Sequence, residues 1–424
     1  MSPKTNGKSK LKVVLVNHSD SLGGASVVTY RLMNALRDAG VDARMVVYTK
    51  TLPDENISVI SNRFRRGTKF LAERVRIFLG NGLNREKLFM VSIANTGTRL
   101  EAHPWIREAD VICLNWINQG MLSLAGVRRL GRLGKPIVWT MHDMWTLTGI
   151  CHHALECDRY KKQCGHCPFL GSHSDRDLSR SVWEKKRDLY DEVPIHFVPV
   201  SNWLAEKARE SSLLKGRDIT VIPNAFPVET FSYEPIGDAS VWGIDTSRRL
   251  ILFGAARIDD PIKGLGYTID ALNFIFDDYP EIASSAAVVF FGDIRDRSLL
   301  DRIRFSHFHA GRISDQKILR SLYSYSDVVL STSLYETLPG TLIEGMAAGC
   351  LPVTFGEGGQ SDIVEHLKTG YIAHYKDPED VARGIMWALA QKPDRRALHE
   401  EVSRRFAAPA VAARYLDLFN RVTR

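Results

Sequence analysis

Two carboxylates near residue 340 have a spacing that could bind hydroxyl groups beside an anion. Glu336 and Glu344 lie eight residues apart in ETLPGTLIE, Glu336 in a turn and Glu344 in the first turn of the helix expected to begin near Thr341. Free amides from Leu338 to Thr341 could bind an anion, and a neighbouring carboxylate could accept hydrogen bonds from two ribose hydroxyls. A capping box formed by Thr341 and Glu344 is an open alternative, which leaves Glu336 unexplained.

Two cations earlier in the same half could bind a diphosphate. Arg257 follows the apolar run RLILFG at 249–254, and Lys263 comes six residues later. Guanidinium and ammonium groups held over the end of a strand could neutralise a diphosphate without a metal ion. Charged surface residues are common, so this pair alone is weak evidence for a diphosphate site.

The first half places further polar groups after apolar runs. Gly23 and Gly24 follow KVVLV at 12–16 and open a helix, where glycine lets the backbone approach a ligand. The pattern is not G-x-G-x-x-G, so dinucleotide binding is not indicated. His142 follows PIVWT at 136–140, where it could bind a hydroxyl, assist proton transfer or simply pack beside tryptophans.

The segment CHHALECDRYKKQCGHCP, 151–168, holds four of the six cysteines of the chain. A C-x5-C-x6-C-x2-C spacing that ends in CxxC suits tetrahedral zinc, and four thiolates would leave no site for water, so the ion would be structural. Disulfides, unpaired thiols and histidine ligands are the alternatives, and three ligands with water would make a catalytic site. The cysteines are Cys151, Cys157, Cys164 and Cys167, and the rival ligands are His152, His153 and His166.

Apolar, β-branched runs alternate with helical patterns along the whole chain. This alternation predicts an α/β fold with doubly wound parallel sheets, and nine runs suit two Rossmann-like domains better than one. The expected strands are 12–16, 43–48, 110–114, 136–140, 195–200, 249–254, 287–292, 327–331 and 351–355.

The irregular segment 224–247 is the expected linker because it is rich in turn-forming residues. We expect an N-terminal domain at 1–223, which includes the Cys-rich loop 151–167, and a C-terminal domain at 248–400. A C-terminal helix is expected within 401–424, and its apolar stripe is expected to pack back on the N-terminal domain.

The composition, with 44% apolar and 25% charged residues, is typical of an ordinary globular protein. The run VVLV near the N-terminus is too short for a signal peptide, and no stretch approaches a membrane span, so we expect a cytoplasmic protein. The net charge is +7, and 63–79 carries six basic residues and one acid among apolar ones. That segment could lie on an anionic membrane surface or form a solvated helix with one core-facing stripe. We expect no nucleic-acid partner.

In this order, GGAS at 23–26, HD at 142–143, Arg257 with Lys263, and E-x7-E followed by AAGCLPV resemble the GT-B glycosyltransferases of family 4, group 1. The resemblance covers essentially the whole chain and is most specific from GRISDQ, at 311, to GEGG. It implies two Rossmann-like domains facing each other across a cleft. A subset of the bacterial family carries a similar four-cysteine insertion.

The resemblance also implies roles for the second half. Arg257 and Lys263 would hold the diphosphate of a sugar nucleotide, Glu344 its ribose, and Glu336 the transferred sugar. The backbone beside Glu336 would contact the sugar and β-phosphate, and three later residues would line the base pocket. The backbone contacts are Thr337, Leu338, Pro339, Gly340 and Thr341, and the base-pocket residues are Gly311, Arg312 and Ile313.

In the first half, the resemblance assigns Gly23 and Gly24 to the diphosphate or acceptor and His142 to the sugar. Asn115 stands where relatives often have histidine, and Gly345 where alanine is common after the second Glu. The DRD at 175–177 follows no strand, so we do not interpret it as a metal site.

These inferences predict a retaining, metal-independent glycosyltransferase that uses a UDP- or GDP-sugar and a glycan or polyprenyl-diphosphate-linked acceptor. Its catalytic residues would be Glu336, His142, Arg257 and Lys263. Surface polysaccharide synthesis at the inner membrane face is the expected role. A nucleotide-sugar 2-epimerase and a non-catalytic donor-binding subunit are the alternatives.

Overall fold

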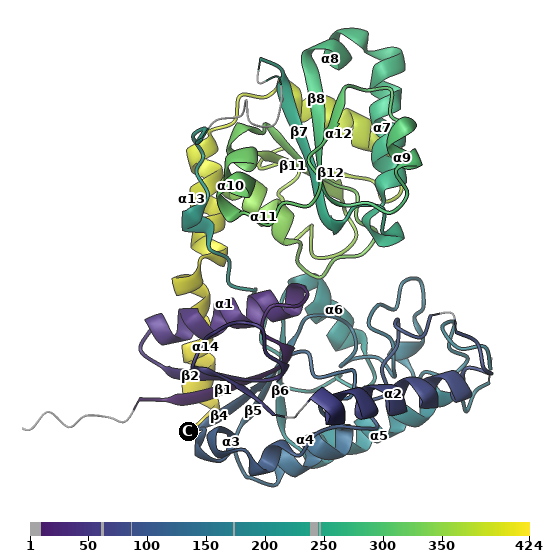
Figure 1. Ribbon diagram of the computed structural model, residues 1–424, viewed down its shortest axis with the longest axis vertical. Helices are drawn as coiled ribbons and strands as arrows, with labels where there is room; N and C mark the ends of the chain where they lie inside the picture. Colours follow the sequence, from purple (N-terminus) through teal and green to yellow (C-terminus); the bar gives the residue numbers. More distant parts are fainter. Residues whose placement is uncertain (1–9, 61–62, 86, 173, 238–244, 246) are drawn as a thin grey trace, which may run out of the picture. The chain divides into compact units, whose positions relative to one another are not determined.

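The computed structural model describes residues 10–60, 63–85, 87–172, 174–237, 245 and 247–424, with backbone alone at 63–65. Residues 238–244 and 246 of the expected linker therefore lie outside the described residues, as do the first nine residues. The chain divides into two compact units, 1–225 with 411–424, and 226–410. Each is an α/β unit with helices on both sides of a parallel sheet (Figure 1).

Unit 1 contains a six-stranded parallel sheet in the order β3-β2-β1-β4-β5-β6. The order reverses between β1 and β4, so the carboxyl ends of these strands mark the expected ligand-binding edge. Its strands are β1 (Lys12–Ser19), β2 (Asp42–Thr49), β3 (Ile57–Val59), β4 (Val111–Leu114), β5 (Ile137–Met141) and β6 (Ile195–Pro199). Its helices are α1 (Gly24–Asp38), α2 (Arg63–Gly80), α3 (Pro104–Glu108), α4 (Leu124–Gly131), α5 (Leu178–Glu192) and α6 (Asn202–Glu210).

Unit 2 contains a second parallel sheet in the order β12-β11-β10-β7-β8-β9, whose order reverses between β7 and β10. Its strands are β7 (Arg249–Arg257), β8 (Ala286–Asp293), β9 (His307–His309), β10 (Val328–Ser331), β11 (Leu351–Phe355) and β12 (Tyr371–Ala373). Its helices are α7 (Leu265–Asp278), α8 (Pro280–Ser285), α9 (Ser298–Asp301), α10 (Gln316–Tyr325), α11 (Gly340–Ala347), α12 (Pro378–Ala390) and α13 (Arg395–Phe406).

The chain ends in two helices where one was expected from 401. α13 stops at Phe406, and α14 (Ala408–Val422) follows Ala407, which is not helical. The apolar stripe of α14 is buried, and the Tyr415 hydroxyl lies 2.9 Å from Thr140 Oγ1 at the end of β5. This contact belongs to unit 1, to which residues 411–424 are assigned.

The basic segment forms the continuous helix α2, and Gly67 does not interrupt it. One face is anchored: the buried Glu73 carboxylate accepts hydrogen bonds from the Ile93 and Ala94 amides, each at 2.9 Å. The other face exposes Leu71, Val75 and Leu79, at 61%, 45% and 56% of their surface. α2 thus has a core-facing side and a solvated apolar stripe at i, i+4 and i+8. Among the described residues, no helix is both long and apolar enough to cross a bilayer.

Candidate functional site

The turn after β7 places Lys263 at the reversal point of the second sheet. A short 3-10 helix, Pro261–Lys263, is capped by the Asp260 carboxylate and ends at Gly264, whose φ is 66°. A Cβ at Gly264 would lie 2.0 Å from the Thr332 carbonyl oxygen, so this turn packs directly on the chain that leaves β10. Glycine is therefore required here both by conformation and by close approach.

Glu336 lies in the loop between β10 and α11, and its carboxylate is ion-paired with the Lys263 ammonium. The two side chains are roughly three-quarters buried, with 28% and 21% of their surface exposed. The structure therefore brings together two of the residues expected to handle charge, at the carboxyl ends of neighbouring strands where ligands of open α/β sheets bind.

Arg257 ends β7 and is held by acids of its own loop. Its guanidinium Nη2 lies 3.0 Å from Asp260 Oδ2, and Nε lies 3.4 Å from Asp259 Oδ1. Asp259 in turn accepts hydrogen bonds from the Arg295 and Asp296 amides at 2.8 and 3.0 Å. One third of the Arg257 side chain is exposed, so the cation is positioned but still open to a ligand.

Helix α11 begins after an N-cap residue that cannot cap it. Its N-cap is Pro339, which has no side-chain hydrogen bond to the helix, and the helix starts at Gly340. The capping box expected as an alternative at Thr341 is therefore wrong, because Thr341 is already inside the helix. Uncapped amides at a helix start favour an anion. Leu338 is buried, whereas Thr341 is partly exposed.

Glu344 lies in the second turn of α11 rather than the first, and Tyr323 positions it. The Tyr323 hydroxyl, fully buried at the end of α10, donates to Glu344 Oε2 at 3.3 Å. The pKa of this tyrosine is raised well above its ordinary value by burial and by the Glu344 charge, so the hydroxyl keeps its proton and acts as a donor. The contact fixes the direction of the carboxylate.

A glycine-rich loop after β11 supports Glu336, and the sequence interpretation assigned it no role. Gly358 has φ 100°, and a Cβ there would lie 2.7 Å from the Glu336 carbonyl oxygen and 2.3 Å from Gln360 Oε1. The Gly359 amide donates to the same Glu336 oxygen at 2.8 Å. Gln360 is fully buried and donates to the Ser333 carbonyl at 3.0 Å. The glycine pair Gly358–Gly359 in GEGGQ is the sequence signal that could have predicted this supporting loop.

The residues expected to line a base pocket follow β9. The Gly311 carbonyl accepts from the Gly292 amide at 2.8 Å, which joins this turn to the end of β8. Arg312 lies 3.6 Å from Asp293 and is 75% exposed, whereas Ile313 is partly buried. The turn is thus placed on the β8 side of the reversal point, beside the cations of the β7 turn.

In unit 1, Gly23 and Gly24 follow β1 at the reversal point. Gly23 has φ 87° and is the N-cap of α1, and a Cβ built on either glycine would meet nothing within 4 Å. The helix start is therefore open on this side. No packing contact in the described structure explains these glycines, although the conformation of Gly23 does.

His142 and Asn115 lie together at the ends of β5 and β4. His142 Nε2 is 3.0 Å from Asn115 Oδ1, and the Asn115 amide nitrogen lies 3.2 Å from the Cys113 carbonyl oxygen. An amide that donates to Cys113 presents its oxygen as an acceptor, so His142 carries its proton on Nε2. Burial lowers the pKa of His142 to about 4, against a weaker opposing effect of Asp143, so the imidazole is neutral near pH 7.

Asp143 is the centre of a network that the sequence analysis did not foresee. Its Oδ2 lies 2.7 Å from His152 Nδ1 and accepts from the Trp116 indole at 2.9 Å, and its Oδ1 accepts from the Trp145 amide at 2.8 Å. Burial alone would raise the pKa of Asp143, but the His152 charge and hydrogen bond outweigh it and lower that pKa to about 2. The HD dipeptide thus ties β4, β5 and the Cys-rich loop together.

The four cysteines of the loop all line one cavity of about 20 Å³, and all six cysteines of the chain are free thiols. The three histidines do not line this cavity: His152 contacts Asp143 and Ser92, and His166 contacts Asp175 at 2.8 Å. Asp177, from the DRD run, is the N-cap of α5 and accepts from the Arg180 amide. The capping of α5 therefore accounts for Asp177.

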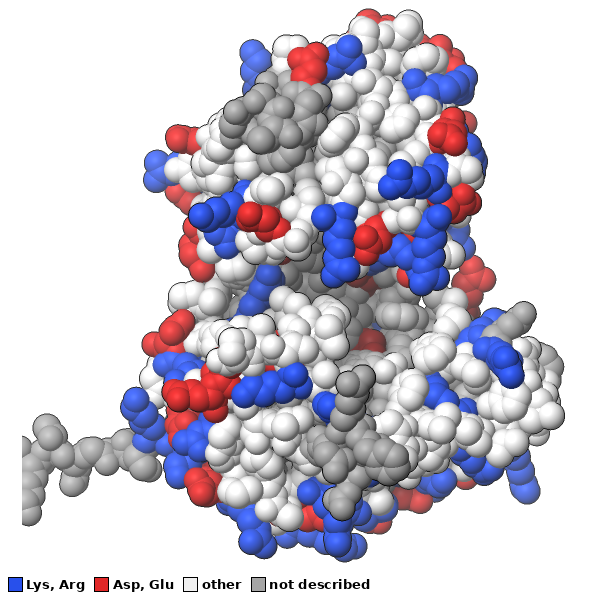
Figure 2. Space-filling view, viewed as in Figure 1, with Lys and Arg blue, Asp and Glu red and all other residues white. Residues whose placement is uncertain are grey.

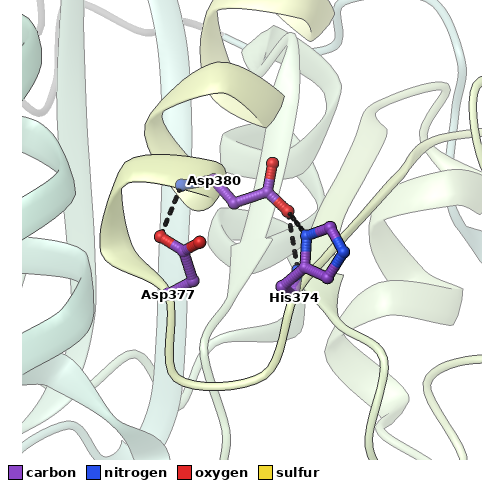
Figure 3. A group of neighbouring side chains, drawn as sticks. All are labelled: His374, Asp377 and Asp380. Atoms are coloured by element: carbon purple, nitrogen blue, oxygen red, sulfur yellow. Dashed lines mark hydrogen bonds and ion pairs between the residues drawn. The ribbon is translucent and has the colours of Figure 1, made fainter.

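One group of three neighbouring ligand atoms within 4.8 Å was found among the described residues: His374, Asp377 and Asp380 (Figure 3). Asp377 caps α12 by accepting from the Asp380 amide at 3.0 Å. Asp380 accepts from the His374 amide at 2.8 Å and from the Tyr371 hydroxyl at 2.8 Å. These contacts explain the group as a helix cap joined to β12.

Lys and Arg side chains are interspersed with Asp and Glu over the face of the molecule in Figure 2. Many pairs are close, such as Arg304 with Asp277 and Arg383 with Asp377. On this face, Lys and Arg side chains are therefore spread among acidic ones rather than gathered in one patch.

Two family models match the chain. Residues 22–230 match Glycosyltransferase Family 4, and residues 281–405 match Glycosyl transferases group 1. An uncharacterised glycosyltransferase of Methanocaldococcus jannaschii is 29% identical over 275 residues, 61% of this chain and 68% of that protein. Spore coat protein SA of Bacillus subtilis is 27% identical over 191 residues, 41% of this chain, and the match spans 49% of that protein.

Solved structures share the fold at low identity. A glycosyltransferase from Rickettsia africae has a TM-score of 0.65 at 15% identity, over 98% of this chain and 99% of that one. Anabaena HepE, solved with UDP and glucose, has a TM-score of 0.61 at 14% identity, over 97% and 100% of the two chains. The expected fold class is confirmed. Each of the two α/β units contains a parallel sheet, and a family model matches each unit. This chain therefore belongs to the GT-B glycosyltransferases of family 4, group 1.

Proposed function

We propose that this protein transfers a sugar from a nucleotide-diphosphate sugar to a glycan or lipid-linked acceptor, with retention of configuration. The observation that carries the proposal is the Lys263–Glu336 ion pair at the reversal point of the second sheet, beside the uncapped start of α11. A pre-placed ammonium and free helix amides suit a diphosphate, and a carboxylate beside them suits a sugar hydroxyl. The structural relative from Anabaena, solved with UDP and glucose, agrees with such a donor.

In the proposed reaction, the costly event is the growth of negative charge on the departing nucleotide diphosphate. Lys263, Arg257 and the α11 amides are placed close enough to offset this charge, and charges placed before the reaction are an effective form of electrostatic catalysis. Glu336 orients the transferred sugar. In the front-face route that the family resemblance implies, the acceptor hydroxyl attacks the anomeric carbon on the side that the phosphate leaves. The departing phosphate oxygen takes the proton of that hydroxyl.

Cation side chains take the place that a divalent ion has in other sugar-nucleotide enzymes, so we propose that catalysis needs no metal. Glu344, held by Tyr323, would accept hydrogen bonds from the ribose hydroxyls. His142 is neutral near pH 7 and donates Nε2–H to Asn115, so it would act on a ligand as an acceptor through Nδ1 rather than as a cation. Gly23 and Gly24 leave space for a phosphate or acceptor at the start of α1.

We further propose that the enzyme works as a peripheral protein on the inner face of the cytoplasmic membrane. The exposed stripe Leu71, Val75 and Leu79 on α2 faces solvent, and the next residue after Val75, Arg76, is also exposed. An amphipathic helix of this kind favours an anionic bilayer surface. Co-sedimentation with vesicles that contain anionic lipid, but not with neutral vesicles, is expected. Replacing the three apolar residues by serine should abolish it.

Incubation of the protein with labelled UDP- and GDP-sugars and a membrane extract tests the main proposal. Transfer of label to an acceptor, with the anomeric configuration read by NMR, is the expected result, and added EDTA should not reduce the rate. Conversion of the donor to its 2-epimer would support the epimerase instead. Donor binding without transfer, hydrolysis or epimerisation would support a non-catalytic subunit.

A further inference from the structure

We propose that Cys151, Cys157, Cys164 and Cys167 bind one structural zinc ion, which holds the Cys-rich loop against the Asp143 carboxylate. The ion would have no part in bond-making, and the inference does not depend on which sugar is transferred. Its evidence is a cavity, amide hydrogen bonds to sulfur, a buried lysine and a direct connection to the HD dipeptide.

The cavity has the chemistry of a four-thiolate site. It measures about 20 Å³, enough for one particle of about the size of water, and all four cysteines contribute to its wall. The remaining wall is mainly apolar or backbone, from residues such as Ile150, Ala154, Pro168 and Phe169. Four cysteine thiolates around one small space are a usual ligand set of structural zinc.

Backbone amides already point at two of the sulfurs. The Gly149 amide donates to Cys164 Sγ at 3.2 Å, and the Phe169 amide bonds Cys167. A Cβ on Gly149 would lie 2.4 Å from the Ser179 carbonyl oxygen and 3.2 Å from that sulfur, so only glycine allows this approach. Amide donors to sulfur stabilise thiolate ligands in metal sites.

The CxxC turn is fixed independently of any ion. Asp177, the N-cap of α5, accepts from the Cys167 amide at 2.7 Å, and Ser179 Oγ accepts from the Gly165 amide at 2.9 Å. Cys164, Gly165 and His166 all have positive φ, which is costly for the two non-glycine residues. A costly turn held by a helix cap is a sign that the direction of its side chains matters.

Lys186 is a fully buried lysine close to Cys164 and Cys151. Its side chain is fully buried on α5, and its ammonium donates to the Trp145 and Thr148 carbonyls. Within the described part of the chain, no carboxylate forms a salt bridge with it. A buried ammonium without a counter-ion is costly, and zinc with four thiolates carries two negative charges close to this lysine.

The sulfur atoms must still move inward to bind an ion. The described residues contain one group of three ligand atoms within 4.8 Å, the His374 group, so the cysteines surround the cavity at wider spacing than bound thiolates have. Rotation about the Cα–Cβ bonds is the movement required, because all four residues already face the same space. Tetrahedral coordination by the four sulfurs, once they have moved inward, can be detected by spectroscopy.

The proposed ion would act on the functional site through a single residue. Cys151 forms an antiparallel backbone β-bridge with Val91. The next residue, His152, places Nδ1 2.7 Å from Asp143 Oδ2. His152 Nε2 lies 2.9 Å from Ser92 Oγ. Fixing Cys151 therefore fixes the imidazole that holds Asp143, and His152 is a positioning residue.

The test is metal analysis of the full chain, purified with a thiol reductant and without chelator. Plasma mass spectrometry should find about one zinc per chain. The double variant Cys164→Ser, Cys167→Ser should retain less than about a tenth. Cobalt exchanged into the wild type should give the intense visible bands of a tetrahedral thiolate complex. This measurement uses the wild-type protein, so it does not depend on the folding of a variant.

Matched variants locate the ion. Cys350→Ser replaces a buried cysteine of unit 2 and should keep the zinc, as should His374→Ala. Cys157→His exchanges one zinc ligand for another and should restore most of the metal that Cys157→Ser loses.

Three results would overturn the inference. The first is wild-type protein with neither zinc nor cobalt bands, its thiols free or disulfide-bonded. The second is zinc that persists in the double variant, and the third is zinc that leaves with His374→Ala. Transfer activity in metal-free wild type would then leave the proposed function standing.

Discussion

The Lys263 ammonium, which follows β7, is paired with the Glu336 carboxylate, which follows β10. The two strands are neighbours where the order of the second sheet reverses. A bound diphosphate would share the ammonium with Glu336 and free part of the carboxylate for a sugar hydroxyl. The pair therefore keeps both groups oriented before the donor binds, which lowers the entropic cost of assembling the site.

Replacing Lys263 by alanine should remove this charge from the site. We expect Lys263→Ala to lower kcat/KM for the donor by at least about 100-fold, because a cation that stabilises the leaving group acts mainly in the transition state. Lys317→Ala, an exposed lysine on α10, is the matched control and should retain activity. Normal thermal unfolding of Lys263→Ala would show that the loss is functional, and unchanged turnover would exclude Lys263 from the site.

Glu344 should recognise the ribose. Glu344→Ala is expected to weaken binding of UDP or GDP by about 10-fold, and Tyr323→Phe by less, since it only frees the carboxylate to rotate. Calorimetry with the 2′-deoxynucleotide gives the sharper readout. The wild type should prefer the ribonucleotide and Glu344→Ala should not, whereas Glu400→Ala, an exposed glutamate on α13, should behave as the wild type. An unchanged ribose preference in Glu344→Ala would assign Glu344 a structural role only.

Gly358 should be sensitive to the smallest substitution. In Gly358→Ala the new methyl group would press on the Glu336 carbonyl oxygen and on Gln360, with a backbone that L-residues rarely adopt. We expect a loss of about 1–3 kcal/mol in stability and weaker donor binding. Gly266→Ala is the control, because a Cβ there meets nothing within 4 Å. Equal effects of the two substitutions in urea unfolding and nucleotide titration would contradict the packing argument.

His142 should contribute to acid sensitivity. The unfolded chain takes up a proton on this histidine near pH 6.5, whereas the native protein does so only near pH 4. Stability from this residue is thus full above pH 6.5 and is lost as the pH falls toward 4. Between pH 7 and 5 the wild type should lose about 2 kcal/mol more than His142→Gln. Urea unfolding at both pH values measures the difference, and parallel losses would show that His142 is not buried neutral.

The sequence predicted the long elements of the fold well, since each of the nine expected strands overlaps an observed one. It missed β3, β9 and β12, which have three residues each. Segments this short and at or near a sheet edge carry no alternating pattern, because their partners rather than their own side chains define them. The break at Ala407 was also missed, although Pro409 in the first turn of α14 marks the start of a new helix.

The candidate site was predicted by residue type and order, not by contact. The sequence placed Lys263 and Glu336 after different strands, and only the sheet order shows that these strands are neighbours. Tyr323, Gly358 and Asp143 of the HD dipeptide were given no role because their contacts are with residues outside their own motifs. Asp143, for example, contacts Trp116, which follows β4, and His152 of the Cys-rich loop. Such partners have no local pattern to reveal them.

A crystal structure of the protein soaked with UDP and, separately, with GDP would test the central claim most directly. The account predicts that the accepted nucleotide places its diphosphate between Lys263 and the first amides of α11, with Arg257 turned toward the phosphates and the ribose on Glu344. A nucleotide bound elsewhere on the chain, with the Lys263–Glu336 pair undisturbed, would contradict it.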